Sequence, residues 1–236
     1  MRWVRKIHKW VSIIIAIQFL LWLLSGLYFN VMDGSKASGR TYKSKQVHQV
    51  QYNLNQLLEP QLVLQKHDEV VELNTVELLG QPYYLLAHEK ALYAHFVNRY
   101  SLVNALTGQL VAMDKTMANA LAKQSYNGPG EIIESKLISN KLVDFPKQKN
   151  PSWQINFNDE INTSVYIEAG SGRIVGHSDD HKRLADIAFM LHFIDYDNVG
   201  GFNNIQNWLF AFFTLWLTLS GLIWTIELGI KGRYTP

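Results

Sequence analysis

The sequence predicts a membrane protein with two transmembrane α-helices and an extracytoplasmic α+β domain of two helix-plus-antiparallel-sheet repeats between them. Two observations support this fold class. Each end of the 236-residue chain contains a long apolar segment, and the polar middle contains one hairpin pattern twice. The chain has no cysteine, so disulfides and cysteine-ligated metals are excluded. A net charge of +2 gives no basic field for a nucleic acid, and no nucleic-acid partner is expected.

The first apolar segment predicts a transmembrane helix over residues 10–32, preceded by a cytoplasmic basic flank of residues 1–9. No charge occurs in residues 10–32, and a helix rising about 1.5 Å per residue needs about 20 apolar residues to cross a bilayer. A cleaved signal peptide would have an apolar core of only about 7–15 residues and a small-residue cleavage site. The sequence lacks that site, so we expect the helix to be retained.

The second apolar segment predicts a transmembrane helix over residues 205–228, followed by a cytoplasmic tail of residues 229–236. An interfacial helix over residues 181–197 precedes it and carries His192 in an apolar run. Positive charges flank both spans on their terminal sides, which favours cytoplasmic termini. Lysines and an arginine also follow the first span, but a long loop is translocated largely regardless of its charge.

The middle of the chain predicts a tether over residues 33–53 and two repeats over residues 54–113 and 114–180. The pattern SLVNALTGQLV, starting at Ser101, aligns with VYIEAGSGRIV, starting at Val165, and each predicts two strands joined by a glycine turn. A helix candidate precedes each hairpin, at residues 54–65 and 115–126. Further strands are expected at residues 73–79, 83–88, 92–97, 132–138 and 153–157.

Both spans contain the tetrapeptide LSGL, at residues 24–27 and 219–222. Small residues allow close approach of helices in lipid, so a packing role is one interpretation and chance recurrence is the other. Gln18 lies within the first span, where an unpaired amide is costly, and we expect it to face another helix.

With RKIHKW opening the first span, the two hairpins, and MLHFIDY leading to LSGLIW, the chain resembles the PepSY-associated transmembrane family. The resemblance implies that the two repeats are PepSY-like and that the protein lies in the bacterial inner membrane with a periplasmic central domain. Some larger members resemble haem-containing ferric-siderophore reductases, in which span histidines are axial ligands. By motif match, His8 and His192 inherit the role of binding haem b.

This chain has two spans, whereas those reductases resemble four-span proteins. His8 and His192 fall at opposite ends of the spans, roughly 30 Å apart, so they cannot ligate one iron within one chain. Haem binding therefore requires a homodimer or a membrane partner subunit. The competing interpretation of His8 is an interfacial polar residue, and that of His192 is a hydrogen-bonded histidine on a helix at the membrane surface.

The other polar candidates favour structural roles. His177 and His181 flank two aspartates in a spacing that would suit a metal, but Ser178 or Asp179 is better explained as a helix N-cap. His88, His95 and the pair Asp159–Glu160 are expected to be solvated. No hydrolase or nucleotide-binding motif occurs, so no catalytic residue and no metal site are assigned.

Two functions follow from the sequence. The first is a haem-b transmembrane electron-transfer component, in which case the chain belongs to an oxidoreductase. The second is a non-enzymatic, membrane-anchored PepSY module of the peptidase-inhibitor or adaptor type, which binds a periplasmic protein or peptide by strand addition. The sequence leaves open whether the chain is an enzyme.

Overall fold

The computed structural model describes residues 2–45, 53–201 and 203–233. The chain forms two compact units, one of residues 1–32 with 186–236 and the other of residues 33–185. They are called here the helical unit and the sheet unit. Residue 1 of the predicted flank, residues 46–52 of the predicted tether, residue 202 and residues 234–236 of the predicted tail lie outside the described residues.

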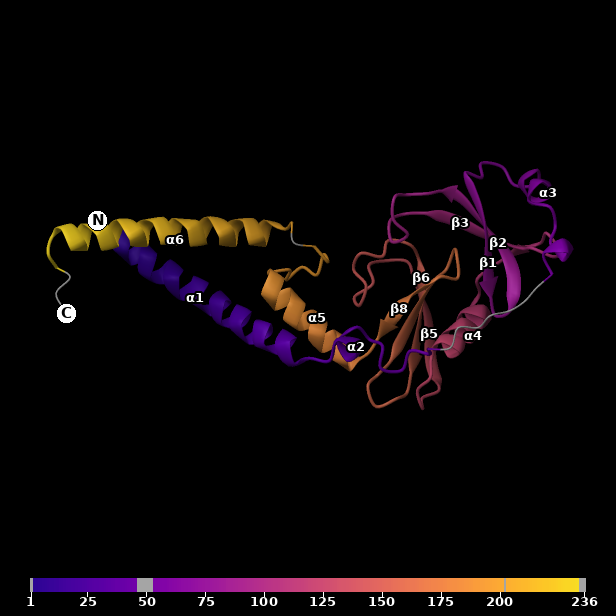
Figure 1. Ribbon diagram of the computed structural model, residues 1–236, viewed down its shortest axis with the longest axis horizontal. Helices are drawn as coiled ribbons and strands as arrows, with labels where there is room; N and C mark the ends of the chain where they lie inside the picture. The colour runs from indigo at the N-terminus through magenta and orange to yellow at the C-terminus, as the bar shows by residue number, and fades with distance from the viewer. Residues whose placement is uncertain (1, 46–52, 202, 234–236) are drawn as a thin grey trace. The chain divides into compact units, whose positions relative to one another are not determined.

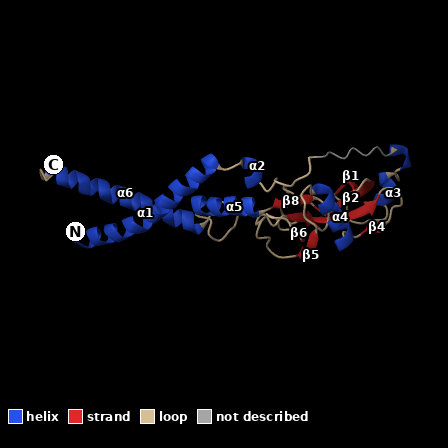
Figure 2. Ribbon diagram, turned by 90° about the horizontal axis from the view of Figure 1, so that it is seen from below, coloured by secondary structure: helices blue, strands red, loops and turns tan. Residues whose placement is uncertain are grey.

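The helical unit contains two helices long and apolar enough to cross a membrane. α1 (Arg2–Val31) includes the candidate span Lys6–Val31, and α6 (Ile205–Ile230) is a candidate span over its full length. The two helices cross and pack against each other (Figure 2). Leu23 and Leu27 of α1 and Phe212 of α6 are among many large apolar side chains that stay exposed. Neither helix is therefore the buried core of a soluble domain within this chain.

The last turns of α5 (Asp180–Phe193) also belong to the helical unit, and side chains from α1 and α6 satisfy their terminal carbonyl groups. Gln18 Nε2 donates to the Leu191 carbonyl at 2.8 Å, and Asn207 Nδ2 donates to the Phe193 carbonyl at 2.8 Å. Because the end of a helix leaves carbonyls unpaired, these amides remove a cost that an apolar medium would increase. The expectation that Gln18 faces another helix is confirmed.

The sheet unit contains two four-stranded antiparallel sheets (Figure 1). The first has the order β1-β2-β3-β4 and the second the order β5-β6-β7-β8. The strands are β1 (Glu72–Leu78), β2 (Gln81–Glu89), β3 (Arg99–Asn104), β4 (Leu110–Val111), β5 (Ile132–Ile138), β6 (Ser152–Phe157), β7 (Ser164–Glu168) and β8 (Ile174–Ser178). The helical segments are α2 (Gly34–Ala37), a 3-10 turn (Leu54–Gln56), α3 (Pro60–Leu64) and α4 (Lys115–Ser125).

Two apolar clusters stabilise the sheet unit. The larger joins α4 to both sheets, with Leu121 packed among Leu102 of β3 and Ile155 of β6. The smaller packs Val63 of α3 against Leu86 and Val103 of the first sheet. The strands predicted at residues 73–79, 83–88, 132–138 and 153–157 and the helix at 115–126 are confirmed to within two residues at each end.

The two predicted hairpins have the same backbone geometry. Gly108 and Gly172 both adopt a φ of +71°, a conformation in which a side chain is strained. In the first hairpin the Asn104 amide donates to the Gln109 carbonyl at 2.8 Å. In the second, the Glu168 amide donates to the Arg173 carbonyl at 2.9 Å. The two aligned sequence patterns therefore form turns of the same kind.

The prediction of one helix over residues 54–65 is only partly correct. A 3-10 turn ends at Gln56, and α3 begins only at Pro60. The residue before a proline is disfavoured in the helical region, and Glu59 has an extended ψ of 127°.

The predicted strand at residues 92–97 is wrong, because this segment is a loop of turns between β2 and β3. Asn98 organises the loop. Its Nδ2 donates to the Phe96 carbonyl at 2.7 Å, and its Oδ1 accepts from the Ala91 amide at 2.8 Å. These side-chain bonds replace the ladder bonds that a strand would make.

Candidate functional site

His8 lies in the second turn of α1 and forms a hydrogen bond with the LSGL segment of α6. Its Nδ1 is 2.9 Å from Ser220 Oγ. The imidazole lies near two indole rings of α6, with centroid distances of 6.1 Å to Trp216 and 6.0 Å to Trp224. A Cβ at Gly221 would lie 3.6 Å from His8 Cε1, an ordinary van der Waals distance, so the edge of the imidazole packs beside this glycine.

His192, in the last turn of α5, forms the matching contact with the LSGL segment of α1. Its Nδ1 is 3.0 Å from Ser25 Oγ, and a Cβ at Gly26 would lie 3.9 Å from its Cε1. Aromatic rings again surround the imidazole, with centroid distances of 6.2 Å to Trp22 and 5.2 Å to Phe29. Each histidine is therefore held by the serine and glycine of an LSGL segment on another helix. We call each arrangement a Ser-Gly cradle.

The serine hydroxyl protons determine which ring nitrogen carries the histidine proton. Ser25 Oγ donates to the Leu21 carbonyl at 2.7 Å, and Ser220 Oγ donates to the Leu217 carbonyl at 3.1 Å. When each hydroxyl proton points to its carbonyl, the serine accepts from Nδ1 of the histidine, and Nε2 then carries the unshared electron pair.

Such an imidazole can accept a proton or bind a metal through Nε2. In protein metal sites, a hydrogen bond to the other ring nitrogen orients the ligand and fixes its tautomer, and imidazole is a common axial ligand of haem iron. The two cradles supply one imidazole each. Ser25 lies roughly 25 Å from His8 along α1 at about 1.5 Å per residue, so the two Nε2 atoms serve separate sites. Among the described residues, no group of three or more histidine, aspartate or glutamate side chains could hold a metal ion.

A buried donor near His192 also lacks an acceptor. The indole Nε1 of Trp22 is buried and makes no hydrogen bond within the described part of the chain. An unpaired buried donor costs about 1–3 kcal/mol, but the chain's own atoms cover this one, so it does not face a bound group. The residues that fit a haem held between chains are the two imidazoles, each bound to a serine through Nδ1.

The sequence identified His8 and His192 but not what holds them. Both LSGL segments are visible in the sequence as a repeated motif, and their expected role was packing between helices. Each LSGL segment binds a histidine that comes from a different helix. Which histidine it binds depends on which helices are neighbours. No spacing in the sequence indicates that arrangement.

His177 is buried in the sheet unit and serves a structural role. Its Nε2 is 3.0 Å from Ser125 Oγ, and burial lowers the pKa of His177 to about 4. Asp179 caps α5 by accepting from the Lys182 amide at 2.9 Å, as predicted.

Two expectations of solvation are wrong. His88 is half-buried, with Nε2 2.9 Å from Ser101 Oγ on the neighbouring strand. Asp159 is buried and accepts from the Tyr126 hydroxyl at 2.7 Å and the Thr163 amide at 3.0 Å. Hydrogen bonds from Thr163 and Tyr126 outweigh the effect of burial and lower the pKa of Asp159. Its burial stabilises the turn before β7.

Comparison of the chain with protein-family models, with curated proteins and with solved structures gives no match. The two cradles and the motifs of the sequence are therefore the features that bear on the function of the chain.

Proposed function

We propose that the chain is a haem-b electron-transfer component of the bacterial inner membrane, of the PepSY-associated transmembrane type. In this proposal α1 and α6 span the bilayer, both termini are cytoplasmic, and the sheet unit is periplasmic. Its two sheets, each preceded by a helix, are two PepSY-like repeats; the equivalent turns at Gly108 and Gly172 support this.

The single observation that carries the proposal is that the same cradle occurs twice. Two histidines far apart in sequence each bind a serine through Nδ1, beside a glycine and two or more aromatic rings. Each therefore has Nε2 available in an apolar setting.

In this proposal His8 and His192 hold haem b, and haem supplies reversible one-electron chemistry when bound. The chain orients each imidazole through Ser220 or Ser25, and its aromatic rings exclude water from the ring faces. One chain offers one imidazole at each level, so a homodimer would pair His8 with its copy and His192 with its copy. The electron donor and acceptor are separate partners.

An absorption spectrum of the full chain in mild detergent tests this proposal. Prepared from haem-replete cells, the protein should show a Soret band and sharp bands after reduction with dithionite. These bands should weaken in both His8→Ala and His192→Ala. His95→Ala is the matched control, because His95 lies in a loop of the sheet unit and should leave the spectrum unchanged. A colourless wild-type protein would exclude haem.

The second candidate function is a binding module without a cofactor, and one observation favours it. β5 is the edge strand of its sheet and pairs only with β6, while Ile133 and Leu137 on it are exposed. An edge strand with apolar side chains can bind an extended peptide by strand addition. Replacing a residue of β5 by proline, as in Glu134→Pro, should abolish capture of an extended periplasmic peptide by the full chain. Lys115→Pro, at the exposed first residue of α4 where a proline is tolerated, should not.

A further inference from the structure

An exposed apolar loop projects from the sheet unit at residues 91–97. The loop carries the large apolar residues that predicted a strand, but the fold does not bury them. Leu92 is 82% exposed, Val97 60%, Tyr93 53% and Phe96 41%. The ring of Tyr93 stacks on that of His95 with a centroid distance of 5.4 Å, so the aromatic side chains form one cluster at the tip.

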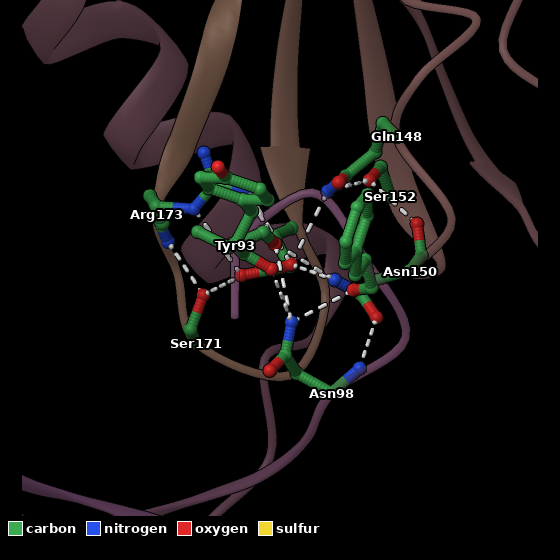
Figure 3. A network of polar contacts seen from close by, with 10 residues as sticks. Tyr93, Asn98, Gln148, Asn150, Ser152, Ser171 and Arg173 are labelled. Atoms are coloured by element: carbon green, nitrogen blue, oxygen red, sulfur yellow. Dashed lines mark hydrogen bonds and ion pairs between the residues drawn. The ribbon is translucent and has the colours of Figure 1, made fainter. Parts of the chain in front are cut away.

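Hydrogen bonds with the side chain of Asn150 hold the backbone of this loop. Glu168, which is only 1% exposed, accepts from Asn150 Nδ2 at 2.6 Å and forms an ion pair with Arg173. Asn150 in turn donates to the Ala94 carbonyl at 3.0 Å and accepts from the Asn98 amide at 2.8 Å (Figure 3). These hydrogen bonds hold the loop backbone in the conformation that leaves its apolar side chains exposed.

The neighbouring loop, residues 139–150, adds positive charge to the same surface. The Lys149 amide donates to the His95 carbonyl at 2.9 Å, which joins the two loops. Lys147 and Lys149 are exposed, and Val143 adds an apolar side chain that is 76% exposed. The only carboxylate among residues 139–150, Asp144, is buried and paired with Arg183 at 3.2 Å. The exposed charge of the loop is therefore positive.

This surface lies at the end of the sheet unit from which the chain continues to the apolar helices. Lys182 Nζ donates to the Asp144 carbonyl at 2.9 Å, and the Arg183 guanidinium binds the Asp144 carboxylate. Both residues belong to the first turn of α5, and the helical unit begins at Asp186. Loop 139–150 is thus attached where the chain leaves the sheet unit for the helices that would span a membrane.

We propose that loops 91–97 and 139–150 form a lipid-docking surface that inserts aromatic and aliphatic side chains among the headgroups of an anionic bilayer. This proposal rests on the membrane insertion stated under Proposed function. Aromatic residues with polar edges favour the membrane interface, and lysines near a bilayer are attracted to anionic lipids. A protein partner of matching shape would not require the surface to lie at the membrane-connected end, whereas a bilayer would.

Cysteine labelling tests the proposal, because the native chain has no cysteine. The full chain carrying Leu92→Cys is labelled with an environment-sensitive fluorophore and incorporated into lipid nanodiscs containing phosphatidylglycerol. The matched control is Leu54→Cys, since Leu54 is also exposed (71%) but belongs to the 3-10 turn before α3. A second loop variant, Val97→Cys, covers the case in which the first fails to fold.

The proposal expects the label at position 92 or 97 to shift its emission to shorter wavelength in the discs and to be quenched by nitroxide-bearing lipid. The label at position 54 should do neither. Substituting Lys147→Glu together with Lys149→Glu should reduce the shift in anionic discs, and discs of phosphatidylcholine should give the smaller shift even with the native lysines.

Two results would overturn the proposal. Loop labels that remain as exposed as the label at position 54 in the discs would show that the loops do not reach lipid. Loop labels that are shifted to shorter wavelength in the discs but are not quenched by nitroxide-bearing lipid would show that protein covers the surface. Failure of the chain to enter discs at all would instead overturn the membrane insertion first, so the two failures are distinguishable.

Discussion

The helical unit and the sheet unit both bury polar side chains, but they satisfy them in different ways. In the helical unit the buried contacts are the histidine–serine pairs of the two cradles, the Gln18 amide that binds a carbonyl of α5, and the Asp195 carboxylate, which among the described residues accepts from backbone amides only. In the sheet unit the buried groups include charged carboxylates, such as Glu168 and Asp144, each paired with an arginine. Neutral pairs suit an apolar medium, where an ion is far more costly.

The buried polar groups of the two units also differ in how many of their hydrogen-bonding atoms are occupied. Glu168 has its oxygens occupied by Gln148, Asn150, Ser171 and Arg173, which leaves it no capacity for chemistry. Each cradle histidine uses only one of its two ring nitrogens for the contact that holds it. His177 of the sheet unit also uses only one ring nitrogen for contacts with the described residues, so the cradle histidines are distinguished by the repeated serine and glycine on another helix rather than by an unused nitrogen alone.

The largest expected effect comes from breaking the charged network. Glu168→Ala removes the buried carboxylate that binds Arg173 and Asn150 and leaves the Arg173 charge without its ion pair. We expect the free energy of unfolding of the sheet unit to fall by about 3 kcal/mol or more. Denaturant unfolding of the full chain in detergent, followed by the part of the tryptophan fluorescence that a Trp153→Phe variant lacks, measures this change.

Glu131→Ala is the control for that experiment, because Glu131 forms an exposed ion pair with Lys123 at 3.1 Å. Loss of this ion pair should lower the free energy of unfolding by less than about 1 kcal/mol. Equal effects of the two substitutions would contradict the importance assigned to the buried network.

The second largest expected effect is a loss of stability of the sheet unit as the pH falls. Burial lowers the pKa of His177 from 6.5 to about 4, so the folded state binds fewer protons than the unfolded state. The contribution of His177 to stability is fully present above its pKa of 6.5 in the unfolded chain, and it is lost as the pH falls from 6.5 towards 4. Between about pH 7 and pH 5 the loss from this group should be about 2 kcal/mol.

His177→Asn removes the titrating group, so its stability should change less over that pH interval than that of the native chain. Unfolding measured at both pH values, with His95→Asn as the control histidine, checks this. A native chain as stable at pH 5 as at pH 7 would refute the assignment of His177 as a buried neutral imidazole.

The smallest effect on stability is expected in the helical unit. Ser25→Ala and Ser220→Ala each remove one neutral hydrogen bond, which in membrane proteins averages about 0.6 kcal/mol. The same substitutions should have a larger effect on any bound haem, because the imidazole loses the bond that fixes its tautomer and orientation. A redox titration of each variant should show a shifted midpoint potential, whereas Thr218→Ala, on α6 but outside the cradles, should show none.

Elements with strong periodicity or turn signals were predictable from the sequence. The two apolar helices, both hairpins and α4 follow from hydrophobic runs and glycine turns that act locally. The apolar run at residues 92–97 resembles a strand in the sequence, but periodicity does not reveal that Asn98 ties the segment into turns. Pro60 is a signal in the sequence against one continuous helix over residues 54–65, because the residue before a proline is disfavoured in the helical region.

The candidate site was predictable only in part. His8 and His192 stood out as imidazoles near or within apolar runs, and the LSGL segments stood out as a repeat. Their contacts depend on the packing of α1 against α6 and of α5 against α1, which are long-range features. The buried environment of Glu168 likewise depends on a loop from another part of the chain. Local sequence patterns do not contain that information.

The most direct test of the central claim is the haem content per chain of the purified native protein and its histidine variants. If His8 and His192 bind haem at two separate levels, each single alanine variant should retain about half of the native haem, and the double variant should retain none. A native protein that contains no haem, or single variants that retain the full amount, would contradict the claim.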